Sequence, residues 1–400
     1  MAFDDLLQHA GGPLSRRSLL RQTVLAGVAT SLSGAAPAEP GIPEAAVRAI
    51  DAAVAACIRD GGGPGTAVAV SVGGKIAFAR GYGMANLETG TPVGVDSVFR
   101  IGSLTKQFTA AAILALVDGG QFALDDPVMT VLQGFPRDYH ITIRELLTHT
   151  SGIHDGSAPI CTISDPPKTQ FELAKAIWLQ PEWLDFPPGS AWSYSNANYI
   201  ILGAILEQTF GRSSLAESMR SLVLNPLELS ATACDDTVTI VPGRVSGTAP
   251  IPGKAGQYTH AAYIPVDAAG GAGSMRSTVG DLCRWHYQLL RGPFAKRPVF
   301  QEMFKPARLR NGALASTHRF LASDAAYGST EYGFGLLLPP PVQGHRTIAH
   351  YGFIDGFSAY LQSFVDAPLT VAVLTNADSN PKLPFSAIRR AVIELVLPTV

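Results

Sequence analysis

The alternation of apolar and polar positions predicts secondary structure clearly at the N-terminal end of the chain. Residues 44–58 carry apolar side chains at helical spacing and stop at three glycines, which predicts a helix. Residues 66–72 and 75–83 are typical of two strands. The Gly73-Gly74 pair between them is a strong signal for a tight hairpin.

Three strand-like runs recur near the C-terminus and are followed by a last helix. These runs and the helix cover residues 346–351, 357–365, 369–375 and 384–397. Because strands lie at both ends of the chain, the simplest assembly is one mostly antiparallel sheet flanked by helices, an α/β (α+β) fold. The sheet region would take residues 44–121 and 266–397, and residues 122–265 would form an inserted helical subdomain.

The first 38 residues differ from the rest and are typical of a bacterial twin-arginine export signal. Arg16-Arg17 precedes a modestly apolar run, and Ala36-Pro37-Ala38 is an A-x-A cleavage pattern. A disordered tail or a membrane anchor is the alternative, but the run is well short of the ~18 residues that a transmembrane helix needs. We therefore expect a periplasmic or secreted mature chain that starts at residue 39 and has no membrane span.

Composition narrows the function classes. The chain has 400 residues of which 46% are hydrophobic, which is ample for a large core. The formal net charge is −2 and no basic run stands out, so nucleic-acid binding has little electrostatic support. Cys161 and Cys234 are a candidate disulfide in an exported protein. Cys57 and Cys283 lie in helical patterns and are expected to be buried thiols.

The strongest chemical signal is Gly102-Ser103 in front of residues 107–117, a run apolar nearly all round and therefore predicted to be a buried helix. Ser103 and Lys106 are spaced i and i+3, so they share a helix face. The helix N-terminus favours negative charge at the serine, and a neighbouring lysine can activate it as a nucleophile.

This S-x-x-K spacing is weak evidence by itself. Ser379 and Lys382 have the same spacing in a predicted loop that leads into no immediate buried helix. On pattern alone, an ordinary helix cap with a solvated lysine explains Ser103 and Lys106 equally well.

A second cluster presents Tyr194 and Asn196 after a Pro/Gly turn and before a helical run at 200–206. A tyrosine near a lysine can act as general base and then as acid to the leaving group. Asn196 is a candidate for positioning a substrate amide and Lys106. Taken alone, a capped turn with half-buried aromatic side chains explains this segment better.

A third cluster, His350-Tyr351-Gly352-Phe353, closes a predicted strand. A glycine in a strand allows close approach of another backbone. A substrate along this edge would meet the Phe353 N–H, which together with the Ser103 N–H makes a plausible oxyanion hole. His350 is a candidate for hydrogen bonding a substrate carboxylate or carbonyl, with a purely structural histidine as the alternative.

Other catalytic templates fail. The sequence contains no G-x-S-x-G, no H-E-x-x-H, no P-loop and no G-x-G-x-x-G after a strand. His149 and His154 flank an expected turn, and we interpret both as structural. No metal and no organic cofactor is therefore predicted.

Taken together and in this order, the three clusters resemble the serine β-lactamase-related family, which includes class C β-lactamases, DD-carboxypeptidases, D-aminopeptidases and esterases. The resemblance covers about residues 44–397. Further matching stretches are Gly81-Tyr82-Gly83, Leu124 to Val128, Ile143 to Gly152, and Gly270 to Ser274. The resemblance implies a penicillin-recognising (β-lactamase / transpeptidase-like) fold with the site between the sheet and the helical subdomain.

The resemblance also implies roles for the residues. Ser103 would be the acylated nucleophile, Lys106 its proton partner and Tyr194 the general base and acid. Asn196 would be a substrate ligand. His350 and Gly352 would line the third wall of the site, where Phe353 donates to the oxyanion hole; these seven assignments are expectations.

One departure from the family pattern affects the substrate. Class C β-lactamases carry Lys-Thr-Gly where this chain has His350-Tyr351-Gly352. A histidine is neutral about as often as charged near its reference pKa of ~6.5, so it replaces a fixed charge poorly. The substitution favours a DD-peptidase, D-amino-acid peptidase or esterase over a β-lactamase.

We therefore expect a hydrolase acting on a small-molecule or peptide substrate. The alternative is a non-catalytic binder or sensor of peptidoglycan fragments or β-lactams on the same fold. The combination of Ser103, Lys106 and Tyr194 argues against that alternative, because a pure binder needs no activated nucleophile. The oligomeric state does not follow from the sequence.

Overall fold

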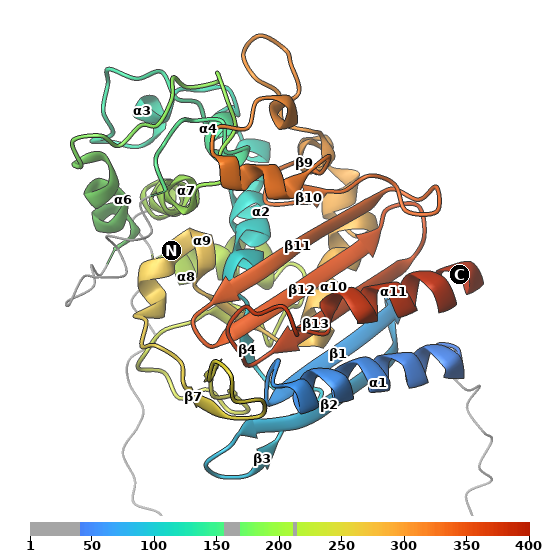
Figure 1. Cartoon of the computed structure of the whole chain (residues 1–400). Helices are drawn as coiled ribbons and strands as arrows, with labels where there is room; N and C mark the ends of the chain where they lie inside the picture. Colours follow the sequence, from blue (N-terminus) through green and yellow to red (C-terminus); the bar gives the residue numbers. More distant parts are fainter. Residues whose placement is uncertain (1–40, 156–168, 211–213) are drawn as a thin grey trace, which may run out of the picture. The chain divides into compact units, whose positions relative to one another are not determined.

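The computed structural model describes residues 41–155, 169–210 and 214–400. These described residues form one compact unit around an eight-stranded antiparallel sheet (Figure 1). Its strands are β1 Gly65–Val72, β2 Lys75–Asn86, β3 Thr91–Pro92, β9 Glu331–Tyr332, β10 Leu337–Leu338, β11 Thr347–Ile354, β12 Phe357–Phe364 and β13 Leu369–Thr375. Their order is β3-β2-β1-β13-β12-β11-β10-β9. The two ends of the chain thus build one sheet, and the predicted fold class is confirmed.

The register explains how the two ends meet. β1 pairs with β13 from Thr66↔Thr375 to Val72↔Leu369. The β1–β2 hairpin turns at Gly73 and Gly74, whose φ angles are +61° and +82°; a two-residue turn of this kind needs positive φ at both positions. β11 runs to Ile354, beyond the predicted end at Tyr351, because pairing with β12 continues through its last residues.

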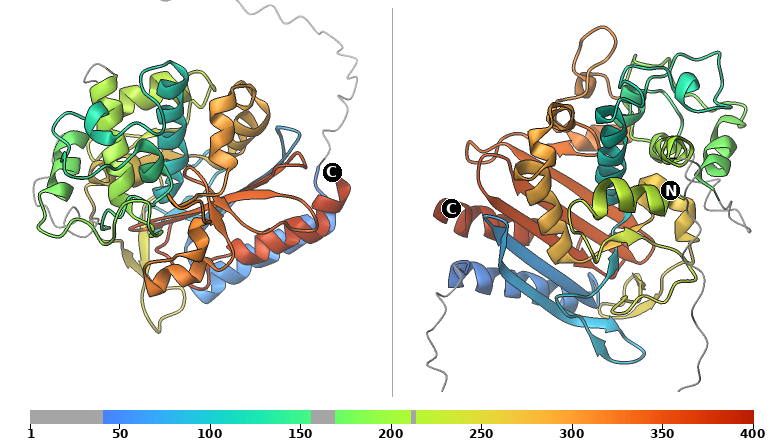
Figure 2. Two further views of the ribbon diagram at one scale, coloured as in Figure 1. Left: turned by 90° about the horizontal axis from the view of Figure 1, so that it is seen from above. Right: turned by 180° about the vertical axis from the view of Figure 1, so that it is seen from behind.

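Helices cover both faces of the sheet. They are α1 Glu44–Asp60, α2 Thr105–Asp118, α3 Val128–Val131, α4 Ile143–Leu147, α6 Gln170–Trp178, α7 Asn196–Thr209, α8 Leu215–Met219, α9 Gly270–Gly273, α10 Val279–Arg291 and α11 Phe385–Leu395. α1 and α11 lie together on one face, and α2, α10 and the helices of the middle of the chain lie on the other (Figure 2).

The two faces have separate hydrophobic cores. On one face Ile50 and Val54 of α1 and Ile388 and Val392 of α11 pack against alternate residues of the central strands. On the other face the core is larger and surrounds α2, which is buried along nearly its whole length. Burial on all sides explains why the sequence of α2 is apolar nearly all round. Packing in this core also holds the N-terminal end of α2 beside the sheet.

Small strands connect the middle of the chain to the start of α2. A three-stranded sheet has the order β4-β8-β5, and β6 pairs with β7. These strands are β4 Phe99–Arg100, β5 Ala233–Cys234, β6 Thr248–Pro250, β7 Tyr258–His260 and β8 Met275–Ser277. Helices α3, α4, α6, α7 and α8 come from residues 122–265; the subdomain boundaries stay a prediction.

Some predictions fall outside the described residues. The export signal at 1–38 and Cys161 lie there, so the export signal and the Cys161–Cys234 disulfide stay predictions. Cys57 and Cys283 are buried as expected, and burial raises the pKa of each thiol to about 12. In the part of the chain that the structure describes, no helix is both long and apolar enough to cross a membrane.

Candidate active site

Ser103 lies in a short 3₁₀ turn, η1 (Gly102–Leu104), that leads directly into α2. Gly102 has a φ of +48°, and a Cβ there would lie 2.7 Å from the Phe353 carbonyl oxygen. At Gly352 a Cβ would lie 1.9 Å from the carbonyl oxygen of Ile101. Because neither position has room for a side chain, the two glycines let the nucleophile's turn and β11 pack backbone against backbone.

This close packing places the turn that carries Ser103 against Phe353 of β11, and the oxyanion hole of these two residues stays a prediction. β10 pairs with β11 at Ala349, so the following residues of β11 extend past that pairing toward the turn. The Ser103 N–H lies at the positive end of α2, and Phe353 belongs to the facing strand. Two backbone N–H groups from different elements are the usual means of binding an oxyanion.

Lys106 is wholly buried one turn into the helix. Its Nζ lies 3.0 Å from Ser103 Oγ, 2.7 Å from Asn196 Oδ1 and 2.9 Å from the Ala272 carbonyl oxygen. Burial lowers the pKa of this lysine from 10.5 to about 7, and the charge of Asp155 opposes part of the fall. The amine is therefore poised to gain or lose a proton near neutral pH.

The partners of Lys106 show where its proton would come from. Two of the three, the Ala272 carbonyl and the Asn196 amide oxygen, can only accept hydrogen bonds. A neutral amine has two N–H groups, which these acceptors would use. Its lone pair would then face the remaining partner, the Ser103 hydroxyl, in the geometry needed to accept its proton.

Tyr194 completes the cluster from the segment before α7. The Lys106 Nζ lies 4.9 Å from the centroid of its ring. Burial raises the pKa of Tyr194 well above its usual value; the neighbouring Tyr327 raises it further, and the hydrogen bond with Ser103 opposes the rise. The phenol is therefore a proton donor in the resting site, and Lys106 is the better first acceptor.

Asn196 begins α7, and its orientation depends on a residue that the sequence analysis missed. Asp155 accepts hydrogen bonds from the Asn196 backbone N–H at 3.0 Å and from its Nδ2 at 3.4 Å. Since Nδ2 faces this carboxylate, Oδ1 must face Lys106. A carboxylate at a helix N-terminus is also favoured by the helix dipole. Nothing in the local pattern around Asp155 signals this contact, because its partner is about forty residues away.

His350 lies on the third wall, but both of its ring nitrogens already have protein partners. Nδ1 donates to the Tyr351 carbonyl at 2.5 Å, and Nε2 lies 3.2 Å from the hydroxyl of Tyr332. Burial, with a contribution from Lys106, lowers the pKa of His350 to about 3. The imidazole is therefore neutral, and a direct hydrogen bond to a substrate would require one of these bonds to be given up.

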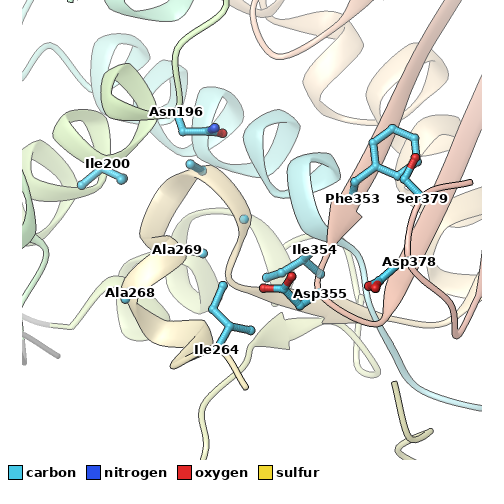
Figure 3. Close-up of a pocket in the computed structure, with 12 residues that line it drawn as sticks. Asn196, Ile200, Ile264, Ala268, Ala269, Phe353, Ile354, Asp355, Asp378 and Ser379 are labelled. Carbon is cyan, nitrogen blue, oxygen red and sulfur yellow. The ribbon is translucent and has the colours of Figure 1, made fainter. Parts of the chain in front are cut away.

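A cavity of about 450 Å³ opens beside Asn196 and Phe353. Figure 3 shows it between the segment that leads into α9 and the turn after β11. Most of its lining is aliphatic, from residues such as Ile200, Ile264, Ala268, Ala269 and Ile354. The far side carries two carboxylates, Asp355 and Asp378 (Figure 3).

The structure also shows where the second S-x-x-K pair and the two histidines of the expected turn lie. Ser379 lines the cavity, but the Lys382 Nζ donates to the Asp60 carbonyl instead of to Ser379. His154 is exposed beside Asp185, whereas His149 is wholly buried behind Tyr194.

Comparisons with known proteins identify the family and similar folds. A family model described as Beta-lactamase matches residues 50–395. Penicillin-binding protein 4* of Bacillus subtilis (strain 168) is 27% identical over 341 residues, which cover 82% of this chain and 71% of that protein. Esterase EstB of Burkholderia gladioli is 36% identical over 193 residues, which cover 44% of this chain and 49% of the esterase. The structure of a D-stereospecific amidohydrolase from Streptomyces sp. superposes with a TM-score of 0.66 at 26% identity and covers 89% of this chain and 99% of that one.

Proposed function

This chain belongs to the beta-lactamase family of serine hydrolases, and we propose that it cleaves an ester or amide bond through an acyl-enzyme on Ser103. The observation that carries the proposal is the buried Lys106 amine, 3.0 Å from Ser103 Oγ. A lysine whose pKa is lowered by burial to about 7 can take the serine proton in its neutral form without a separate base.

In the acylation step that we propose, Ser103 Oγ attacks the substrate carbonyl carbon while its proton passes to Lys106. The backbone N–H groups of Ser103 and Phe353 stabilise the negative oxygen that forms. When the bond to the leaving group breaks, the hydroxyl of Tyr194 donates a proton to that group. The Lys106 ammonium then returns a proton to Tyr194, so that the cluster regains its starting protonation.

In deacylation a water molecule attacks the ester carbon on the same face that the leaving group vacated. Its proton passes through Tyr194 and Lys106, and the bond between Ser103 Oγ and the acyl carbon breaks. Ser103 recovers its proton and the product leaves as an acid. In this scheme Tyr194 acts first as an acid, which its raised pKa favours. It acts second as a base, because it passes its own proton to Lys106 as it takes one from the water.

The surroundings of Ser103 favour a peptidase or esterase over a β-lactamase. His350 stands where class C enzymes carry a lysine, and its neutral ring supplies no fixed charge for a β-lactam carboxylate. The cavity beside Asn196 suits the acyl part of the substrate: its aliphatic wall favours an apolar group, and Asp355 and Asp378 disfavour an anionic one. Esters and amides of D-amino acids fit these conditions, in line with the activities named for the similar proteins.

The test is a substrate panel with a matched nucleophile variant. We expect the wild-type protein to hydrolyse p-nitrophenyl esters or D-amino-acid p-nitroanilides, and to act on a chromogenic cephalosporin much more slowly. Ser103→Ala should abolish all of these activities without changing the fold. If Ser103→Ala hydrolyses the same substrates at the wild-type rate, the acyl-enzyme proposal is wrong. If the wild type acts on none of them, a binder or sensor becomes the better hypothesis.

We also propose that the protein works outside the cytoplasm. The support is the twin-arginine pattern with its A-x-A site in residues 1–38. In a bacterial host with a twin-arginine pathway, the full chain should appear in the periplasmic or secreted fraction. Replacing Arg16 and Arg17 by lysine should retain it in the cytoplasm; export that is unaffected by this change would contradict the proposal.

A further inference from the structure

His149 holds the segment that carries Tyr194 through three hydrogen bonds. Its carbonyl oxygen accepts from the Ser193 N–H at 3.1 Å. Its Nδ1 accepts from the Ser195 N–H at 3.2 Å and from the side-chain amide of Asn198 at 3.1 Å. Because Ser193 and Ser195 are the chain neighbours of Tyr194, these bonds fix the backbone on both sides of the tyrosine.

The protonation of His149 follows from the same contacts. The Ser195 N–H can only donate, so Nδ1 must present a lone pair. Asn198 agrees with this, because its Oδ1 accepts from the Ser151 hydroxyl at 2.6 Å and its NH₂ therefore faces the imidazole. Burial, and next the charge of Lys106, lower the pKa of His149 well below its usual value, so the ring is neutral with hydrogen on Nε2. Within the described residues this buried nitrogen has no hydrogen-bond partner.

The imidazole also packs against the tyrosine itself. The ring centroids of His149 and Tyr194 are 4.5 Å apart with an interplanar angle of 38°. Tyr332 lies against the same imidazole, with the centroids 4.7 Å apart. The fully buried imidazole therefore blocks movement of the Tyr194 phenol toward its side of the site.

The backbone of His149 is unusual for its residue type. Its φ is +60°, a left-handed conformation that is uncommon outside glycine and that persists only where surrounding contacts enforce it. Here the turn after α4 adopts this conformation while the side chain reaches into the Tyr194 segment. Asparagine is the residue that best combines tolerance of this conformation with an acceptor near the Nδ1 position.

We propose that His149 is a positioning residue that holds the Tyr194 phenol at Ser103 and Lys106 through its Nδ1 lone pair and the face of its ring. The proposal rests on the hydrolytic function proposed above, in which Tyr194 transfers protons. It assigns this buried histidine a part in the rate of proton transfer and none in substrate binding.

The test compares two substitutions in two backgrounds, with hydrolysis of a p-nitrophenyl ester as the assay. His149→Leu keeps an apolar side chain but removes the acceptor, and we expect it to lower kcat by about 100-fold while KM changes less than about threefold. His149→Asn keeps an acceptor and should recover at least about tenfold of that loss. In a Tyr194→Phe background, His149→Leu should cost less than about threefold, because there is no phenol left to position.

Several results would overturn the proposal. A folded His149→Leu variant with wild-type kcat would do so, and so would an Asn variant as impaired as the Leu variant. A loss of the same size in the Tyr194→Phe background would indicate a general structural role.

Should the Leu variant not fold, His149→Gln replaces it, because the longer side chain carries its amide beyond the Nδ1 position. The outcome for Ser103→Ala separates the two proposals: if it abolishes turnover while His149→Leu has no effect, only the positioning role fails.

Discussion

The pKa of Lys106 leads to a quantitative expectation for the pH dependence of both activity and stability. Burial lowers this pKa from 10.5 to about 7, a change of about 3.5 units. At ~1.36 kcal/mol per unit, the folded protein disfavours the charged amine by about 5 kcal/mol relative to water. Because the side chain is wholly buried, solvent does not screen this penalty.

For activity, we expect kcat/KM for a neutral ester to rise with pH and to level off above a midpoint of about 7. The neutral amine accepts the serine proton and the ammonium cannot. Two buried histidines do not interfere, since the pKa values of His350 and His286 are lowered to about 3. The control for the exposed His154 is the pH profile of kcat/KM for His154→Asn, which should match the wild-type profile.

For stability, the sign follows from proton uptake. Between pH 7 and 10.5 the unfolded chain holds a proton on Lys106 that the folded chain lacks, so the free energy of unfolding should rise with pH. Relative to a Lys106→Met variant, which has no such group, the rise should be about 1.4 kcal/mol per pH unit from about pH 7 to 9.5. Urea unfolding of both proteins at several pH values measures it. A kcat/KM that is flat from pH 5.5 to 8.5, or a stability difference independent of pH, would refute the reasoning.

Three further expectations concern the rest of the site. Gly352→Ala places a Cβ 1.9 Å from the Ile101 carbonyl oxygen. It should lower kcat by about 100-fold and the free energy of unfolding by about 1–3 kcal/mol. The control is Gly94→Ala, whose Cβ would lie 3.9 Å from Ser97 Oγ and which should show neither change in ester assays and urea unfolding. Asp155→Asn removes the charge that raises the pKa of Lys106, so the acid limb of the kcat/KM profile should move to lower pH; a shift to higher pH would contradict this placement. Ala269→Phe narrows the cavity beside Asn196, and should reduce kcat/KM for long-chain p-nitrophenyl esters far more than for the acetate.

Local sequence patterns were sufficient to predict the long strands of the central sheet. The hairpin at Gly73-Gly74 and the strands at the C-terminal end follow from periodicity and turn chemistry, which depend on near neighbours in sequence. The i and i+3 spacing of Ser103 and Lys106 was enough to place them in contact, because a helix fixes that geometry. The pairing of Phe353 with Ser103 was a hypothesis from a glycine in a strand, and the family resemblance supported it; no local rule joins residues 250 positions apart.

The sequence analysis did not identify the residues that act through tertiary contacts. Asp155 orients Asn196, and the Tyr332 hydroxyl forms a hydrogen bond with Nε2 of His350. Neither Asp155 nor Tyr332 lies in a recognisable motif. The neutral state of His350 also depends on burial that only the assembled fold creates. His149 was interpreted as structural from its place in a turn, and its bonds on both sides of Tyr194 appear only when α4 and α7 are packed together.

The most direct test of the central claim is the intact mass of the protein after incubation with a fluorophosphonate and, separately, with a fluorescent penicillin. We predict a single covalent adduct in the wild type with at least one probe, located on the peptide that contains Ser103, and none with Ser103→Ala. A penicillin adduct would indicate a DD-peptidase-like site, and a fluorophosphonate adduct alone an esterase or peptidase. An adduct that persists in Ser103→Ala, or a folded wild type that neither probe labels, would contradict the assignment of Ser103 as the acylated nucleophile.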